Sequence, residues 1–435
     1  MKSKARRAWK SFGGPGWSIR YIGITGTDGK STTSGASYHI LKSAGVRVGI
    51  ISTVHIDVWA WLQDNISHMT SLDHKMFWSY IDQAAHNGLT HMVIEVSSHA
   101  LYQYRIWPLM FESVGVTNLT REHLDFHWTM EHYAQTKGEL FGRLVNGGLG
   151  ILPQDFEYKK YFRKPSEMIR QSLKTFGQNE RADIFVSDIV QHPSLEFDLH
   201  IWWEQTHISS QLVWVFNTDN LMIAAQMAYN EWLSLKQIKQ WIQSYKGLPG
   251  RQELIHTQEG ITAMIDFAVT PDALSTVYNA AREMWYERLI VIFGATGNRD
   301  QGKRPKMGAI AAQLCDIVII TEDENYHEDG MEIMKQVEKG VGVQTSRRVD
   351  EKKWAGVLSS WAESKAANTH DFKYELVQDR AEAIYRGLEL AQPGDVVIVT
   401  GMANFTTRSM NEWSIPRNEK EVIETQMERL GMTVV

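Results

Sequence analysis

The chain has 435 residues, of which 43% are hydrophobic and 22% are charged, and its formal net charge is −6. A chain of this length is too long for one ordinary hydrophobic core and predicts two domains, or three. The composition is that of a globular protein, and the negative net charge gives no overall attraction to nucleic acid. The single cysteine, Cys315, excludes an internal disulfide and a cysteine-rich zinc site, and so favours the reducing cytoplasm. No apolar stretch approaches the roughly 18–20 residues of a membrane span.

The first 20 residues form a basic segment. It lacks the apolar core of a secretory signal. We interpret it as a solvated terminus, and the alternative is a weak contact with phosphates or an anionic membrane surface. Its cations are Lys2, Lys4, Arg6, Arg7 and Lys10.

A glycine-rich loop follows the first strongly predicted strand, residues 21–25. The loop is Gly26-Thr27-Asp28-Gly29-Lys30-Ser31-Thr32, and a helical pattern covers residues 33–44. A phosphate cradle has this order, because backbone N–H groups at such a turn point at one anion. Lys30 can reach the β- and γ-phosphates, and the Ser31 hydroxyl can ligate Mg²⁺. The usual spacing places a glycine at position 24, which is Ile24 here, so the loop is a shortened variant; the alternative is a structural turn with an exposed lysine.

The pattern over residues 21–247 predicts an α/β domain. Apolar β runs at residues 91–96 and 114–118 alternate with helical segments, which indicates a mainly parallel sheet with both faces covered. Alternating apolar and polar residues then predict an antiparallel meander. Its three runs are residues 184–189, 195–202 and 208–215, and helices are expected at residues 220–231 and 236–245.

The turn-rich segment Gly247-Leu248-Pro249-Gly250 is the predicted linker to a second domain, residues 248–435. Beyond it, apolar β runs again alternate with helical stretches, which predicts a smaller Rossmann-like domain. These runs are residues 261–266, 289–293, 316–321, 374–377 and 396–400.

Three side chains near predicted strand ends are candidate functional groups. Glu95 ends one buried strand, His123 follows another, and Lys137 lies on a probable helix. The carboxyl edge of a parallel sheet is where α/β proteins bind ligands, so Glu95 could hold Mg²⁺. Taken singly, His123 is more often a hydrogen-bonding residue than a ligand, and Lys137 is more often exposed on a helix.

Together these motifs resemble the Mur ligase family, and within it the MurE-like synthetases that add the third residue of the peptidoglycan stem peptide. The loop at residues 26–32 resembles the family's ATP loop, and residues 95–101 and 117–125 resemble the tripeptide synthetases. Further matches run in family order up to residue 401: Gly250-Arg251, Asp266-Phe267-Ala268, residues 270–274, Gly297-Asn298-Arg299-Asp300, residues 302–305 and residues 379–384.

The resemblance implies an ATP- and Mg²⁺-dependent, ADP-forming amide ligase. In this family ATP phosphorylates a substrate carboxylate, and an amino acid's amine attacks the acyl phosphate and releases phosphate. The expected substrates are a muramoyl peptide precursor and an amino acid, with no nucleic acid and no integral membrane segment.

The resemblance also implies residue roles. Catalysis is expected from Lys30, Lys137, His123 and Glu95, with Lys137 as a carbamoylated lysine, a CO₂ adduct that steadies the second Mg²⁺. Metal ligation is expected from Ser31, Glu95, His123 and Lys137. Nucleotide contacts are expected from Gly26, Thr27, Asp28, Gly29, Lys30, Ser31, Thr32, Asn220, Arg251 and Asp266.

Further residues match positions that hold the other two substrates. Arg299 matches a contact to the carboxylate of the incoming amino acid. The expected substrate-binding set is Thr70, Ser71, Ser98, Gln103, Arg105, Arg299 and Asp323.

The chain departs from the family pattern in three places. About 20 residues precede the loop, where these synthetases carry a uridine-nucleotide-binding domain, so we expect a uridine-linked substrate to lose one of its contacts. The Asp-Asn-Pro-Arg signature of diaminopimelate-adding members reads Asp323-Glu324-Asn325-Tyr326, and their Gly-Lys-Gly-His-Glu motif reads Gly401-Met402-Ala403-Asn404-Phe405. Without the arginine and the glutamate, diaminopimelate is not the expected substrate, because a polar ligand needs matched partners. The histidine expected after Ala268 is Val269.

Two other readings stay open at this stage. One is a folylpolyglutamate synthase-like or other Mur-type ligase, and the other is a catalytically inactive nucleotide-binding regulator. Relatives that amidate lipid II usually carry a four-cysteine zinc ribbon, which one cysteine cannot build.

Overall fold

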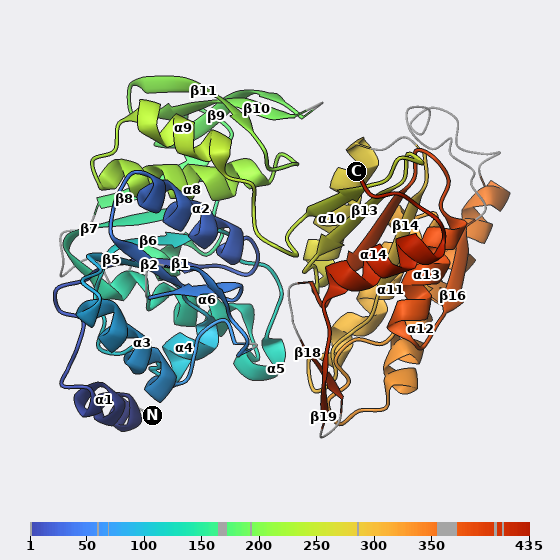
Figure 1. Cartoon of the computed structure of the whole chain (residues 1–435), viewed down its shortest axis with the longest axis horizontal. Coiled ribbons are helices and arrows are strands. Elements are labelled where there is room, and N and C mark those ends of the chain that lie inside the picture. The colour runs from blue at the N-terminus through green and yellow to red at the C-terminus, as the bar shows by residue number, and fades with distance from the viewer. Residues whose placement is uncertain are drawn as a thin grey trace. The chain divides into compact units, whose positions relative to one another are not determined.

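The computed structural model describes residues 2–58, 61–67, 69–163, 172–191, 194–284, 287–354, 372–403, 407–410 and 413–435. The chain divides into two compact units, residues 1–248 and 249–435 (Figure 1). In the part of the chain so described, no helix has the length and apolarity that crossing a membrane requires.

Within these ranges, unit 1 is built on an 11-stranded sheet of order β11-β10-β9-β8-β7-β6-β1-β5-β2-β3-β4. Strands β2, β5, β1, β6, β7, β8 and β9 pair in parallel, and the outer strands at both ends pair antiparallel. The strands are β1 (Arg20–Thr25), β2 (Val48–Ile51), β3 (His55–Asp57), β4 (Gln63–Asp64), β5 (His91–Glu95), β6 (Phe111–Val116), β7 (Leu144–Pro153), β8 (Ser172–Gly177), β9 (Ile184–Val190), β10 (Leu195–Ile201) and β11 (Glu204–Ser210).

Helices cover both faces of this sheet, because alternate strand residues point to opposite sides. Figure 1 shows α2 and α8 over one face of the sheet and α3 and α4 over the other. Ile22 belongs to the core cluster that includes residues of α2, α8 and α9, and its neighbour Tyr21 belongs to the cluster that includes residues of α3 and α4. The helices are α1 (Lys2–Ser11), α2 (Lys30–Ser43), α3 (His74–His86), α4 (Ser98–Tyr102), α5 (Leu124–His127), α6 (Met130–Gly138), η1 (Phe141–Arg143), α7 (Lys159–Arg163), α8 (Asn217–Asn230) and α9 (Leu235–Ser244).

Two sequence predictions for unit 1 need correction. The third meander strand is Glu204–Ser210 rather than residues 208–215, because the chain reverses in a tight turn at Trp202, whose φ is 59°. The basic N-terminal segment is not simply a solvated terminus, because it forms helix α1 with Ala5 buried.

Unit 2 carries a six-stranded sheet, counted over the described residues, of order β12-β13-β17-β14-β15-β16. All five predicted β runs of this region are found as parallel strands, and β12 adds an antiparallel edge. The strands are β12 (Glu253–His256), β13 (Thr262–Asp266), β14 (Leu289–Phe293), β15 (Ile317–Ile320), β16 (Lys373–Leu376) and β17 (Val396–Thr400), with a separate hairpin of β18 (Thr407–Met410) and β19 (Trp413–Pro416).

The helices of unit 2 pack against this sheet in a Rossmann-like arrangement. One core cluster joins the sheet to α13 and α14 through Ile384, Leu388 and Met427. The helices are α10 (Pro271–Met284), η3 (Gln301–Lys303), α11 (Arg304–Leu314), α12 (Gly330–Trp354), α13 (Arg380–Leu390) and α14 (Glu419–Arg429).

Candidate active site

The glycine loop lies between β1 and α2 and has a backbone that only glycine fits. Gly26 has φ 146° and Gly29 has φ 78°. A Cβ atom on Gly26 would lie 1.8 Å from Oγ1 of Thr117, and one on Gly29 would lie 2.3 Å from Oδ1 of Asn220. Both positions therefore need glycine for conformation and for space.

The chain after β6 holds this loop in place. Asn118 accepts the N–H of Thr27 at 3.1 Å and, through its side chain, the N–H of Asp28 at 2.9 Å. The Thr117 hydroxyl donates to the carbonyl of Asp28 at 2.5 Å. Lys30 folds back to donate to the carbonyl of Thr27 at 2.8 Å, so its amine lies at the loop. Sequence reasoning had placed Thr117 and Asn118 only in a matched motif, without this role.

Glu95 is buried at the carboxyl end of β5, next to the start of α2. The Ser31 hydroxyl lies 3.1 and 3.2 Å from its two carboxylate oxygens. Thr53 donates to the same carboxylate through its N–H at 2.9 Å and its hydroxyl at 3.0 Å. The structure thus brings Ser31 and Glu95 together, and their hard oxygen atoms are the ligand type that Mg²⁺ prefers. Thr53 carried no sequence signal, because it belongs to no recognised motif.

Lys137 is buried on α6, with 2% of its surface exposed, which contradicts the reading of an exposed helix residue. Its Nζ atom lies 2.6 Å from the carbonyl oxygen of Gly26 and 4.7 Å from the ring centroid of Tyr133. Burial first, and then the charge of Lys30, lowers the pKa of the Lys137 amine well below its ordinary value. Asp28 and Glu95 oppose this shift only in part.

His123 lies at the start of α5 in a left-handed conformation, with φ 56°. Its ring is 4.8 Å from that of His99 and 6.2 Å from that of Tyr133, and its Nδ1 is 4.0 Å from the Glu122 carboxylate. Tyr133 thus contacts both His123 and Lys137. Among the described residues, no group of three or more His, Cys, Asp and Glu is spaced to hold a metal ion. Of the four expected ligands, Ser31 contacts Glu95 directly, and His123 and Lys137 both lie beside Tyr133.

Four of the expected substrate residues form a hydrogen-bonded series that begins at the strand bearing Glu95. Ser71 donates to the carbonyl of Glu95 at 3.2 Å, and its own carbonyl accepts Nη1 of Arg105 at 2.7 Å. Nε of Arg105 donates to Gln103 at 2.8 Å. The Thr70 hydroxyl is 3.0 Å from that of Thr53, which itself holds Glu95.

Ser98, the fifth, contacts a histidine that sequence reasoning missed. Its hydroxyl lies 3.0 Å from Nε2 of His127, which is fully buried. Burial, with the nearby His99, His132 and Lys137, lowers the pKa of His127 to about 4. His127 follows His123 by four residues, and that spacing was the available signal.

Asn220 lies near the start of α8 beside the glycine loop. Its Oδ1 accepts the Thr33 hydroxyl at 3.0 Å, and its Nδ2 donates to Asn217 at 3.0 Å. The Thr33 contact ties α8 to α2, and the Asn217 contact lies within α8.

In unit 2, Asp266 ends β13 and is almost fully buried. Its carboxylate accepts N–H and Nε2 of Gln252, at 3.1 and 2.6 Å, and the N–H of Ala268 at 2.8 Å. Burial raises its pKa, and the positive charge of Arg251 opposes this. The Arg251 guanidinium lies 4.1 Å from the ring centroid of Phe267.

Arg299 and Asp323 lie in the loops after β14 and β15. The Arg299 guanidinium is 5.7 Å from the ring centroid of Tyr326, whose hydroxyl donates to Glu324 at 3.1 Å. Asp323 is 3% exposed and lies against Gly401, because a Cβ there would be 2.2 Å from its Oδ2. Of the later motif, Asn404 and Phe405 lie outside the described residues.

Comparison with known proteins gives the family of this chain. The family model described as the Mur ligase middle domain matches residues 24–228, and the one described as the Mur ligase, glutamate ligase domain matches residues 250–403. A protein of Clostridium acetobutylicum named UDP-N-acetylmuramoyl-L-alanyl-D-glutamate–2,6-diaminopimelate ligase 1 is 30% identical over 424 residues, which are 96% of this chain and 80% of that protein. The chain belongs to the Mur ligase family. The expected family and fold class are therefore confirmed.

Two solved Mur ligase structures share the fold. A UDP-N-acetylmuramoyl-L-alanyl-D-glutamate–2,6-diaminopimelate ligase matches with a TM-score of 0.63 at 24% identity, over 98% of this chain and 81% of that one. A MurF ligase from Thermotoga maritima in complex with ADP matches with a TM-score of 0.65 at 16% identity, over 98% and 83%. The matched family models and the 30% identical relative show that this Mur ligase is an ATP-dependent, ADP-forming ligase of peptidoglycan synthesis.

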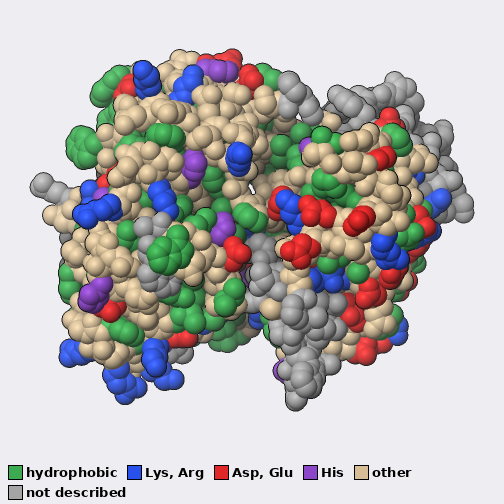
Figure 2. All heavy atoms as spheres, viewed as in Figure 1, with side chains coloured by type: hydrophobic (Ala, Val, Ile, Leu, Met, Phe, Trp, Pro, Cys, Tyr) green, Lys and Arg blue, Asp and Glu red, His purple; other side chains and the backbone are tan. Residues whose placement is uncertain are grey.

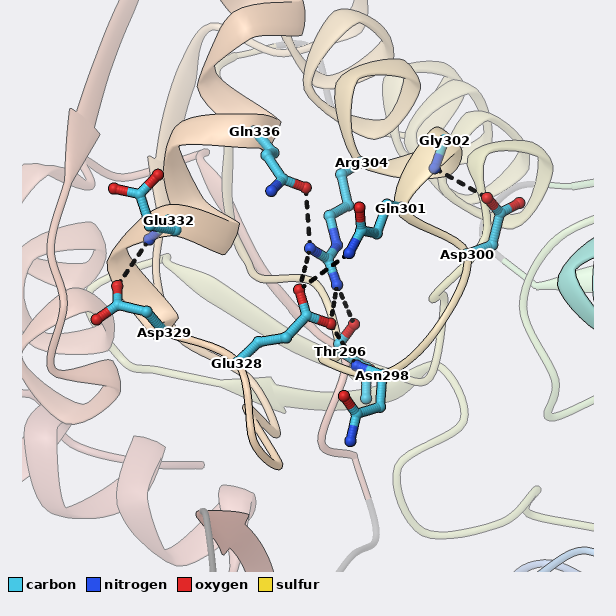
Figure 3. A network of polar contacts seen from close by, with 10 residues as sticks. All are labelled: Thr296, Asn298, Asp300, Gln301, Gly302, Arg304, Glu328, Asp329, Glu332 and Gln336. Atoms are coloured by element: carbon cyan, nitrogen blue, oxygen red, sulfur yellow. Dashed lines mark hydrogen bonds and ion pairs between the residues drawn. The ribbon is translucent and has the colours of Figure 1, made fainter.

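A polar network supports the loop of this Mur ligase that carries Arg299 (Figure 3). Arg304 is fully buried and forms a two-pronged ion pair with Glu328, at 2.8 and 2.9 Å. It also donates to the carbonyl of Thr296 at 3.2 Å, and Glu328 accepts the N–H of Asn298. Thr296 and Asn298, which both precede Arg299, are therefore held by one ion pair, Thr296 through Arg304 and Asn298 through Glu328. The sequence matched Arg304 to a family motif without indicating this role.

Proposed function

We propose that this ligase adds an amino acid to a muramoyl dipeptide, as the third residue of the peptide. The observation that carries the proposal is the hydrogen-bonded series from Glu95 through Ser71 to Arg105, because it joins the expected dipeptide residues to the expected metal ligand. The name of the Clostridium acetobutylicum relative, a ligase of the alanyl-glutamate muramoyl precursor, supports the same substrate class.

The nucleotide and metal contacts are proposed as follows. Bound ATP supplies the phosphoryl group that activates the substrate carboxylate. The loop N–H groups and Lys30 hold its phosphates, and Ser31, Glu95 and His123 bind Mg²⁺. We assign further nucleotide contacts to Asn220, Arg251 and Asp266. We assign the central ATP-binding domain to residues 21–247 and the C-terminal domain to residues 248–435.

Lys137 is proposed to act as a carbamate. The amine attacks CO₂ and loses one proton, so that a neutral group becomes an anion. This reaction needs the unprotonated amine, and the lowered pKa of Lys137 supplies it. An anion at this position also offsets the charge of Lys30, and it offers oxygen atoms to Mg²⁺.

The incoming amino acid is proposed to bind near Arg299, and to be other than diaminopimelate. Tyr326 stands where diaminopimelate-adding members have an arginine, and its hydroxyl is already bonded to Glu324. A second carboxylate on the substrate would therefore lack its charged partner. Glu324 and Asp323 instead favour a substrate side chain that is not anionic.

The test is a phosphate-release assay over acceptors and amino acids. The acceptors are uridine-linked and lipid-linked muramoyl dipeptides and a folyl glutamate, and the amino acids include diaminopimelate and lysine. We expect release only when a muramoyl dipeptide and an amino acid are both present. Phosphate release with the folyl acceptor but with neither muramoyl dipeptide would support a folylpolyglutamate synthase-like activity. No release with any pair of acceptor and amino acid would support a catalytically inactive nucleotide-binding regulator.

Two variants test the substrate assignments. Arg105→Ala should raise KM for the dipeptide about tenfold or more with KM for ATP unchanged, because it removes one charged contact; Arg181→Ala, an exposed arginine, is the control. Tyr326→Arg should raise the rate with diaminopimelate relative to the wild type. An unchanged amino-acid profile in Tyr326→Arg would remove Tyr326 from selection.

A further inference from the structure

Helix α1 carries a concentrated positive charge on its outer side. Ala5 is buried and Trp9 is partly buried against unit 1, so the helix lies on the surface along one side. The exposed residues of its other side are mostly basic, and Figure 2 shows Lys and Arg side chains gathered over α1. We call these cations the basic face: Lys2, Lys4, Arg6, Arg7 and Lys10.

An apolar cavity opens beside this helix. It has a volume of about 270 Å³ and is lined by Trp9, Trp17, Trp78, Pro108, Leu109 and Met110, among others. Two of its walls reach the surface, because Trp17 is 72% exposed and Met110 is 39% exposed. The ring of Trp17 lies 5.7 Å from that of Trp9, which joins the cavity to α1.

Among the polar groups that line the cavity, the side chains of Arg20, Glu112 and Tyr21 have partners, whereas the buried indole N–H of Trp78 has none. Arg20 pairs with Glu112 at 3.9 Å and with Glu231 at 2.7 Å. The Tyr21 hydroxyl donates to the carbonyl of Gly16 at 3.0 Å. Because most of its lining side chains are apolar, the cavity suits an alkyl chain better than a polar ligand, most of whose groups would stay unpaired.

The cavity lies at the edge of the sheet opposite to the phosphate loop. Arg20, Glu112 and Val145 line the cavity near the amino ends of β1, β6 and β7, whereas the loop follows the carboxyl end of β1. β1 has six residues, so the two edges are about 20 Å apart. A contact at one edge leaves the nucleotide edge accessible.

We propose that the basic face and this cavity form a docking site for an anionic phospholipid membrane. The five cations bind the headgroups, and Trp17 and Met110 insert at the boundary between headgroups and acyl chains, where an amphipathic indole is favoured. The chain as a whole carries a charge of −6, so attraction to an anionic surface is confined to a local cluster of this kind. Single-stranded nucleic acid also binds through cations and aromatic rings, but it offers no alkyl chain to the apolar cavity.

The test is flotation of the full-length protein with vesicles of phosphatidylglycerol, compared with phosphatidylcholine. We expect binding to the anionic vesicles that falls with added salt. The triple variant Arg6→Glu/Arg7→Glu/Lys10→Glu should lose about 100-fold in partitioning, because each cation contributes roughly fivefold at such a surface. The control Lys236→Glu/Lys239→Glu/Lys246→Glu carries the same charge change on another surface and should bind like the wild type.

Tryptophan quenching by brominated acyl chains reports on insertion. Wild-type fluorescence should be quenched on anionic vesicles, and Trp17→Phe should lose part of that quenching. Circular dichroism checks that each variant is folded. Equal vesicle binding by the two triple variants would overturn the proposal, and so would no binding of the wild type to either kind of vesicle. Binding of the protein to a single-stranded RNA but not to vesicles would also overturn it.

Discussion

The Nζ atom of Lys137 lies 2.6 Å from the carbonyl oxygen of Gly26, under the first residue of the phosphate loop. The amine is buried, and Lys30 on the same loop adds a second positive charge nearby. A buried ammonium beside another cation is costly, so the amine is favoured in its neutral or chemically modified form.

Replacement of Lys137 by alanine should abolish ligation, because it removes the group proposed to become an anion. Alanine has no amine that CO₂ could modify. Short-chain carboxylates can instead occupy the space that the lysine side chain leaves, and they should recover part of the rate. The measurement is phosphate release with and without added acetate or propionate. Lys160→Ala, at an exposed position on α7, is the control. Wild-type activity of Lys137→Ala would end the carbamate proposal.

Replacement of Gly26 by alanine should weaken nucleotide binding at least about tenfold and lower the stability of the protein. The new Cβ would lie 1.8 Å from Oγ1 of Thr117, so the loop or the chain after β6 must move. The matched control is Gly147→Ala, since Gly147 also has a positive φ, of 84°, with no atom within 4 Å of an added Cβ. Calorimetry with ADP and thermal unfolding of both variants make the comparison. Equal effects would show that backbone strain alone matters at residue 26.

His127 should make the free energy of unfolding depend on pH. Its pKa is lowered to about 4 in the folded chain, while the unfolded chain binds the proton near 6.5. Between these two pH values the unfolded state binds more protons than the folded state. The contribution of His127 to the free energy of unfolding is therefore complete above pH 6.5 and falls as the pH drops towards 4. In His127→Gln the slope should be smaller, by up to about 1.4 kcal/mol per pH unit in that window. Urea unfolding across the pH range measures it, with His86→Gln as the exposed control. An identical slope in His127→Gln and the wild type would contradict the assignment.

Replacement of Arg304 by alanine should destabilise unit 2 by about 3 kcal/mol, the scale of removing one partner of a buried ion pair. It should also raise KM for the amino acid, because Thr296 and Asn298 lose the network that holds the loop of Arg299 (Figure 3). Lys335→Ala, which removes an exposed ion pair with Glu332 on α12, should change stability by less than about 1 kcal/mol. Chemical unfolding and amino-acid titrations provide both readouts. A normal KM in a folded Arg304→Ala protein would contradict the positioning role.

Local sequence patterns predicted much of the fold. The alternation of β runs and helical stretches located all five parallel strands of unit 2 and the start of the meander at β9. Among the elements it missed are β2, β7, β8 and helix α1. β7 contains Gly147 and Gly148, which weaken a strand signal, and α1 is stabilised by packing of Ala5 and Trp9 rather than by its own polar pattern.

The sequence by itself determined the chemistry of the phosphate loop, because Gly26, Gly29, Lys30 and Ser31 are adjacent in the chain and act through local backbone geometry. The tertiary structure decided which distant residues meet that loop. Strand β1 lies between β5 and β6, and this order alone brings Glu95 to Ser31 and Thr117 to Gly26. The burial of Lys137 was decided in the same way. Burial depends on the packing of elements far apart in sequence, and no local pattern encodes it.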